Sequence, residues 1–176
     1  MVAAVVLAAG ASTRFGSPKQ RILLGPVLER VRQAQSIEQF VVVLGAYDVE
    51  TTAPSVRCPD WERGMGASLR CGLAALPADT KAAVVVLADG PDLAPAAIDR
   101  VVAAWRERGG ELLAASYDGV RSHPVLVARS LWDRIPDEGA RELEADLVPC
   151  DDLGTPGDID FAEQLPSRLR ATAGEP

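Results

Sequence analysis

The chain has 176 residues, of which 48% are hydrophobic and 24% are charged, and these values are typical of one globular domain with a sizeable core. A net charge of −7 argues against a protein that coats nucleic acid, although a local basic pocket for a small anion is compatible with it. The first apolar run follows no basic segment and is too short to span a bilayer, so we expect neither a signal peptide nor membrane insertion, and a cytoplasmic location.

Strand and helix patterns alternate along the chain. Apolar runs without polar alternation predict strands at 2–7, 40–45 and 82–88, each buried on both faces. Apolar residues at helical spacing predict helices at 65–76 and 95–108. The other expected elements are a helix at 26–34 with Pro26 in its first turn, strands at 111–117, 124–128 and 147–150, short helices at 129–135 and 137–143, a turn at 118–122, and a last helix that opens at 155–158 with Thr155 as its N-cap.

This alternation predicts an α/β fold: a single-domain, mostly parallel, Rossmann-like sheet with helices on both faces. We expect the domain to cover residues 1–165 and residues 166–176 to form a flexible tail. In open sheets of this kind, ligands bind outside the carboxyl ends of the strands. Residues directly after the predicted strands are therefore the candidates for the functional site.

The three cysteines, Cys58, Cys71 and Cys150, show no spacing typical of a disulfide framework or a metal site. Cys71 falls in an apolar helical pattern, and we expect it to be a small core residue.

The loop after the first predicted strand has the composition of an anion-binding loop. Gly10 and Gly16 let the backbone bend, and the small side chains of 9–12 leave backbone N–H groups free to face a ligand. Arg14 and Lys19 add positive charge, and together these features suit a triphosphate. The alternative is a glycine- and alanine-rich turn that only links a strand to a helix, because neither G-x-G-x-x-G nor G-x-x-x-x-G-K-[ST] is present. The expected triphosphate contacts in this segment are Leu7, Ala8, Ala9, Gly10, Ser12, Gly16 and Lys19.

Asp89 ends the third predicted strand, where a carboxylate points toward the ligand crevice. Beside a triphosphate, such a carboxylate most simply holds Mg²⁺, which prefers oxygen ligands. The alternative is a turn residue, because the sequence continues as Gly90-Pro91.

Several segments resemble the motifs of one protein family. The pattern Leu7-Ala-Ala-Gly10-x-Ser12-x-Arg14-x-Gly16-x-x-Lys19 resembles the signature of nucleotidyltransferases of the molybdenum-cofactor type, and residues 61–73 resemble the W-x-x-G-M-x-x-S-L-x-x-G-L element of the same family. This family includes molybdenum cofactor cytidylyltransferases and molybdopterin-guanine dinucleotide synthases. The resemblance implies a GT-A-like fold and transfer of a nucleoside monophosphate from a nucleoside triphosphate to a phosphorylated acceptor. Ala9 corresponds to the cytidylyl form of the motif, which implies CTP and a molybdopterin-type acceptor.

The resemblance also implies roles for individual residues. Lys19, Arg14 and Asp89 would act in catalysis, while Gly66 and Ser68 would line the nucleotide pocket at a helix N-terminus. No pair of a nucleophile and a base is apparent, which fits direct in-line attack by the acceptor phosphate, with Lys19 stabilising charge.

A second Mg²⁺ ligand is expected at Asp152, because residues 151–158 resemble the family motif D-I-D-T-P-E-D. Gly154 replaces the second aspartate of that motif here, and an acidic turn followed by an N-cap is the alternative.

His123 and Arg121 are expected on the acceptor side, since Ser122-His123-Pro124 resembles the Gly-His-Pro of the family. The alternative for His123 is a structural role in the turn before Pro124. The implied partners are a nucleoside triphosphate, a phosphorylated small molecule and, transiently, a molybdoenzyme or its chaperone.

Two other functions remain open. One is a nucleotidyltransferase that uses GTP or a different acceptor, such as a phospholactate-, sugar- or polyol-phosphate. The other is a non-catalytic, chaperone-like module that binds a nucleotide or cofactor.

Overall fold

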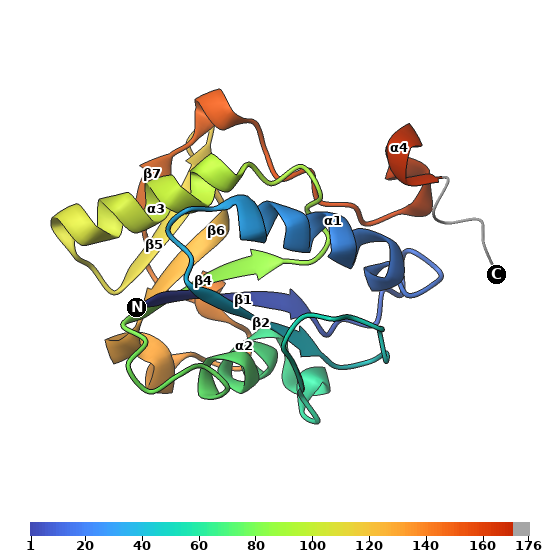
Figure 1. Ribbon diagram of the computed structural model, residues 1–176, viewed down its shortest axis with the longest axis horizontal. Coiled ribbons are helices and arrows are strands. Elements are labelled where there is room, and N and C mark those ends of the chain that lie inside the picture. Colours follow the sequence, from blue (N-terminus) through green and yellow to red (C-terminus); the bar gives the residue numbers. More distant parts are fainter. Residues whose placement is uncertain (171–176) are drawn as a thin grey trace.

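The computed structural model describes residues 1–170, which form a seven-stranded sheet in the order β3-β2-β1-β4-β6-β5-β7 (Figure 1). Strand β6 runs antiparallel to its neighbours β4 and β5, and all other neighbouring strands are parallel. The predicted mostly parallel α/β sheet is therefore confirmed. The strands are β1 (Val2–Ala8), β2 (Gln39–Leu44), β3 (Ser55–Arg57), β4 (Ala82–Leu87), β5 (Leu112–Tyr117), β6 (Val120–Ala128) and β7 (Asp146–Pro149).

Helices cover both faces of this sheet. Figure 1 shows α1 (Gln20–Gln33) and α3 (Pro95–Arg108) on one face, and α2 (Met65–Ala74) on the other. The shorter helices are α4 (Ser167–Arg170) and the 3-10 helices η1 (Trp61–Arg63), η2 (Arg129–Arg134), η3 (Ala140–Glu142), η4 (Asp151–Leu153) and η5 (Ala162–Gln164).

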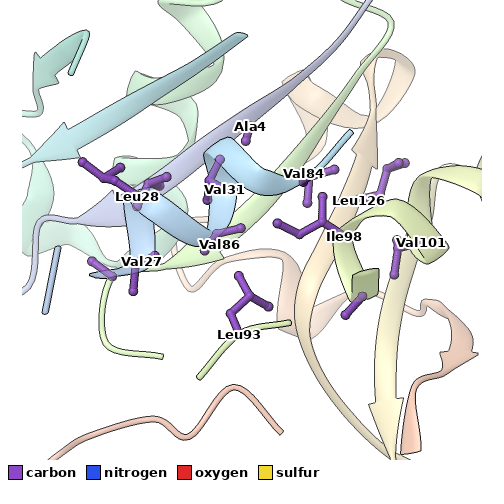
Figure 2. Packing of buried hydrophobic residues seen from close by; sticks show 14 of the residues in the cluster. Ala4, Val27, Leu28, Val31, Val84, Val86, Leu93, Ile98, Val101 and Leu126 are labelled. Atoms are coloured by element: carbon purple, nitrogen blue, oxygen red, sulfur yellow. The ribbon is translucent and has the colours of Figure 1, made fainter. Parts of the chain in front are cut away.

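Strand β1 lies at the centre of the core, and all seven of its residues are buried. Alternate residues of a strand point to opposite faces, so Ala4 and Val6 pack under α1 and α3, while Val5 packs under α2. Figure 2 shows the first of these layers, in which Val27 and Ile98 contribute from the two helices. Burial on both faces explains why the sequence of β1 is apolar without alternation.

The pairing of the strands places their carboxyl ends together. Leu7 of β1 lies opposite Val43 of β2 and Leu87 of β4. The loop that follows β1 and Asp89, which follows β4, therefore meet at one edge of the sheet. This is the edge toward which the arrowheads of β1, β2 and β4 point in Figure 1.

Three expected elements differ in the structure. Helix α1 begins at Gln20, and Pro26 lies inside it, where the missing N–H costs one helical hydrogen bond. No helix opens at 155–158, because Gly154 and Gly157 adopt positive φ angles of 73° and 69° and the segment is extended. The turn at 118–122 is shorter than expected, since Val120 already belongs to β6.

Cys58 and Cys71 form a disulfide, so the expectation that Cys71 is a simple core residue is wrong. Cys58 follows β3 and Cys71 lies on α2, and their Cα atoms are 5.7 Å apart. Their separation of 13 residues gave no recognisable spacing signal, because the contact depends on how α2 packs beside β3. Cys150 is free and buried.

Part of the expected tail is ordered as helix α4, whose Arg168 forms an ion pair with Asp92. Leu169 of this helix packs against the small apolar cluster that contains Phe15 and Leu23. Residues 171–176, where the rest of the expected tail falls, lie outside the described residues. Within residues 1–170, no helix is long and apolar enough to cross a membrane.

We predict that reduction of the Cys58–Cys71 disulfide lowers the free energy of unfolding by about 3 kcal/mol, the value expected when a loop of about 15 residues regains its entropy. Urea denaturation with and without dithiothreitol measures the difference. The double variant Cys58→Ser/Cys71→Ser is the control, because its denaturation midpoint should not respond to dithiothreitol. Identical midpoints for the oxidised and reduced wild-type protein would contradict the prediction.

Candidate active site

A cavity of about 390 Å³ opens at the carboxyl ends of β1 and β4. Its walls come from the loop after β1, the start of α2, the end of β4 and Asp160 near the end of the described chain. The residues expected from the sequence that line it are Leu7, Ala8, Ala9, Gly10, Ser12, Arg14, Lys19, Ser68 and Asp89. The expected site residues Gly16, Gly66, Arg121, His123 and Asp152 do not belong to its lining, as far as residues 1–170 define it.

In the loop after β1, backbone carbonyl groups accept hydrogen bonds from the protein, whereas, within residues 1–170, N–H groups are left free beside the cavity. The carbonyl oxygens of Ala9 and Gly10 accept hydrogen bonds from the Ala46 N–H (3.0 Å) and the Gln20 side chain (2.6 Å). The Ala11 carbonyl accepts one from the Tyr47 hydroxyl (2.9 Å). Within the described chain, the N–H groups of residues 10–14 donate to no other backbone group. A row of free N–H groups beside a cavity is the backbone arrangement that binds anions.

A tight turn at Ser12 continues this loop toward Lys19. The Ser12 carbonyl accepts hydrogen bonds from the N–H groups of Phe15 (3.0 Å) and Gly16 (3.3 Å). Ser12 and Gly16 have φ angles of 51° and 81°, a region that glycine adopts without strain. Gly16 therefore lets the backbone bend, as predicted, whereas its contact with the triphosphate stays a prediction.

Lys19 lies at the centre of the polar contacts in the cavity. Its ammonium Nζ is 2.8 Å from the carboxylate of Asp89 and 3.6 Å from that of Asp160, and it donates to the Ile159 carbonyl at 2.7 Å. Arg14 forms a second ion pair with Asp160 at 3.0 Å. The two expected cations are thus brought together with Asp89, and with a carboxylate from the far end of the chain.

The segment 156–160 lies against the residues that follow β4. The Ile159 N–H donates to the Asp89 carbonyl and the Asp92 N–H donates to the Pro156 carbonyl, both at 2.9 Å. A Cβ atom at Gly90 would lie 2.9 Å from the Pro156 side chain, so only glycine allows this approach. The backbone pairing brings Asp158 and Asp160 next to Asp89.

The carboxylates of Asp89, Asp158 and Asp160 create a concentrated negative charge. Burial raises the pKa of the Asp158 carboxyl, and the charges of Asp89 and Asp160 raise that pKa further, while Lys19 opposes them. In the described chain, the Oδ1 atom of Asp89 is buried and has no hydrogen-bond partner. Among residues 1–170, no three Asp, Glu, His or Cys side chains are arranged to hold a metal ion. The buried, unpartnered oxygen of Asp89 is still of the type that Mg²⁺ and Mn²⁺ prefer.

The structure does not bring Asp152 into this group. Asp152 lies on η4, where its two carboxylate oxygens accept hydrogen bonds from Arg100 at 2.5 and 2.8 Å. This bidentate pair lowers the pKa of Asp152 to about 2. Asp152 does not belong to the lining of the cavity, and its expected sharing of a metal with Asp89 stays a prediction.

Another part of the cavity wall comes from η1 and the start of α2, which contribute Trp61, Met65 and Ser68 to the lining. Gly66 packs instead under residues 136–139, because its N–H donates to the Asp137 carbonyl at 2.8 Å and a Cβ atom would lie 1.7 Å from the Pro136 carbonyl oxygen. Gly66 therefore permits close packing behind this wall.

His123 and Arg121 lie on β6, outside the cavity lining. Burial lowers the pKa of His123 to about 4, so its imidazole is uncharged at neutral pH. The Arg121 guanidinium donates to the carbonyl groups of Leu143 (2.7 Å) and Ala140 (3.0 Å), and so holds the segment after η2. These contacts use both terminal nitrogens of Arg121, which are the groups that would bind an acceptor phosphate. A contact of His123 or Arg121 with the acceptor stays a prediction.

Comparison with known protein families matches residues 4–147 to the MobA-like NTP transferase domain. The chain belongs to this family. A comparison with curated proteins found no match.

Solved structures share the fold of this MobA-like NTP transferase domain over nearly its whole length. Rv0371c from Mycobacterium tuberculosis H37Rv is 28% identical, with a TM-score of 0.80 over 96% of this chain and 97% of that one. A structure of Rv0371c in complex with manganese aligns with 25% identity and a TM-score of 0.76, covering 97% and 98% of the two chains. Molybdopterin-guanine dinucleotide biosynthesis protein A from Archaeoglobus fulgidus is 17% identical, with a TM-score of 0.70 over 99% and 100%, and shows the shared fold.

In this MobA-like domain, sequence analysis missed Asp158 and Asp160. The signal was present, because Asp158-Ile159-Asp160 reproduces the D-I-D of the motif that we assigned to 151–158. Thr155-Pro156 matches the T-P of the same motif, and this match places the first aspartate of the motif at Asp152. The hydrogen bond from the Ile159 N–H to the Asp89 carbonyl favours the register that contains Asp158 and Asp160.

We predict that Asp158→Asn abolishes the rise in Tm that Mg²⁺ or Mn²⁺ causes, because it removes one carboxylate of the cluster. The same change relieves charge crowding, so the Tm of the metal-free variant should rise by about 2–4 °C for each ~1 kcal/mol of relief. Thermal denaturation with and without metal measures both effects.

Asp152→Asn is the matched control for this experiment. It removes the same charge from an exposed ion pair, so it should change stability by at most ~1 kcal/mol and keep the metal response. A metal response that is lost in Asp152→Asn and kept in Asp158→Asn would restore the original assignment.

Proposed function

We propose that this MobA-like NTP transferase transfers CMP from CTP to a phosphorylated acceptor of the molybdopterin type, with Mg²⁺, and releases pyrophosphate. The observation that carries the proposal is the juxtaposition of an anion-binding loop with a lysine and a carboxylate cluster in one cavity. A triphosphate bridges such an arrangement naturally, because its charge requires both N–H donors and cations.

The reaction needs no protein nucleophile. A phosphate oxygen of the acceptor attacks the α-phosphorus of CTP, the bond from that phosphorus to the bridging oxygen breaks, and pyrophosphate leaves with the electron pair. The free N–H groups of residues 10–14 and the charge of Arg14 hold the phosphates in place. Lys19 neutralises the charge that develops on the α-phosphate and on the leaving group.

Asp89, Asp158 and Asp160 would hold the divalent cation, which supplies positive charge between the phosphates. Support comes from the unpartnered Asp89 oxygen and from the manganese complex of the similar Rv0371c. Lys19 keeps Asp89 and Asp160 fixed before ligands bind, because its ammonium already contacts both.

The preference for CTP rests on Ala9, which corresponds to the cytidylyl form of the sequence motif and belongs to the lining of the cavity. A molybdopterin-type acceptor is supported by the sequence motifs, to which His123 belongs.

The experiment combines ligand-induced thermal shifts with an assay of pyrophosphate release. We predict that CTP with Mg²⁺ raises Tm more than GTP, ATP or UTP, because a ligand that binds only the native state stabilises it in proportion to its affinity. Pyrophosphate should then appear in equal amount to the dinucleotide product when molybdopterin is added.

A larger shift with GTP, or turnover only with a sugar-, polyol- or phospholactate-type phosphate, would replace the proposed substrates. Binding of a triphosphate with no turnover on any acceptor would favour the nucleotide-binding module.

We predict that Lys19→Ala lowers kcat by roughly 10²–10³-fold, about 2.7–4 kcal/mol, by analogy with the loss of one preorganised donor in a transition state. Lys81→Ala is a matched control, because it removes the same charge from the only other lysine of the chain, at an exposed position. Steady-state kinetics of both variants separate the effects. A Lys19→Ala enzyme with normal kcat and raised KM would show that Lys19 contributes only substrate binding.

A further inference from the structure

Gln20 is a buried polar residue that the proposed mechanism leaves without a role. It is the first residue of α1, directly after Lys19, and only 4% of its surface is exposed. Its Nε2 donates to the Gly10 carbonyl at 2.6 Å, and its Oε1 accepts a hydrogen bond from the Ser12 hydroxyl at 2.9 Å. Both ends of the side-chain amide are therefore committed to the loop after β1.

Tyr47 makes a comparable hydrogen bond to the same loop, from a different segment of the chain. It lies in the segment after β2, and its hydroxyl donates to the Ala11 carbonyl at 2.9 Å. The carbonyl groups of two successive loop residues are thus held by side chains from two different elements. The neighbouring carbonyls of Ala9 and Ser12 are held by backbone N–H groups.

The geometry of the peptide bond turns these contacts into control of the N–H groups. Each peptide unit is planar and trans, so its C=O and N–H point in opposite directions. Fixing the Gly10 carbonyl therefore orients the N–H of Ala11, and fixing the Ala11 carbonyl orients the N–H of Ser12. These N–H groups have no backbone acceptor within the described chain.

We propose that Gln20 and Tyr47 are positioning residues, which aim the N–H groups of Ala11 and Ser12 at the triphosphate without contacting it themselves. The inference rests on the proposed function, because it assumes that the loop binds the phosphates. It adds that the loop is preorganised by side chains, so little ordering is needed when the ligand binds.

The test uses Gln20→Met, which keeps the length of the side chain and removes both hydrogen bonds. Isothermal titration well below Tm gives the Kd for inorganic tripolyphosphate and for CTP with Mg²⁺. We expect Kd to rise about tenfold for both ligands, since two hydrogen bonds of ordinary strength are lost. Tyr47→Phe, which removes one hydroxyl, should raise Kd by about three- to fivefold.

Gln33→Met is the matched control. It makes the same substitution on the same helix, at an exposed position where the side-chain amide donates a hydrogen bond to Glu29. Its Kd values should equal those of the wild-type protein.

Kinetics distinguish positioning of the loop from a purely structural role. Gln20→Met should raise the KM for CTP by more than it lowers kcat, because the oriented N–H groups bind the phosphates in the ground state as well as in the transition state. A lower Tm with an unchanged Kd and KM would show that Gln20 only stabilises the fold, and would overturn the inference. If Gln20→Met does not fold, an unchanged Kd in Tyr47→Phe overturns it instead.

The inference and the proposed function fail in different ways. Wild-type protein that binds tripolyphosphate but transfers no nucleotide would refute the transfer reaction, and the variants would still report on positioning. Wild-type protein that binds neither tripolyphosphate nor CTP would refute both.

Discussion

The Lys19 ammonium connects the loop after β1 with the segment 156–160, which lies far from it in the sequence. One side chain reaches Asp89 at the end of β4 and Asp160 and the Ile159 carbonyl near the end of the described residues. Only 13% of the Lys19 side chain is exposed, so these contacts are stronger than those of a surface ion pair. Together with the hydrogen bond from the Ile159 N–H to the Asp89 carbonyl, they hold the anion-binding loop and the carboxylates in a fixed relation.

This arrangement sets an electrostatic problem for the proposed reaction. A chain with a net charge of −7 has the carboxylates of Asp89 and Asp160 in the lining of a site for a highly anionic substrate, and the charge of Asp158 acts close to both. Lys19 and Arg14 already pair with Asp89 and Asp160, so they are shared between the protein and the ligand. A divalent cation resolves the conflict, because it binds carboxylate and phosphate oxygens at once. In this view, the cluster repels triphosphate alone and accepts it together with its metal.

Sequence patterns predicted the sheet well, because β1 and β4 are apolar throughout and such runs form strands only where both faces are covered. The three residues of β3 are too few for periodicity to reveal, and the Cys58–Cys71 bond depends on tertiary packing. In the site, Lys19 and Asp89 were identifiable because each directly follows or ends a recognisable element. The choice between Asp152 and Asp158 depends on which segment lies beside Asp89, and the hydrogen bond from the Ile159 N–H to the Asp89 carbonyl favours Asp158.

In the proposed function, the loop after β1 and the cluster of Asp89, Asp158 and Asp160 together bind a metal–triphosphate complex. A crystal of the protein grown with CTP and Mn²⁺ would show this binding, because anomalous scattering locates manganese independently of the protein coordinates. We predict one anomalous peak within about 2.0–2.3 Å of Asp89 and at least one of the other two carboxylates, with the phosphates against the N–H groups of residues 10–14. A peak at Asp152, or phosphates bound away from this loop, would contradict it.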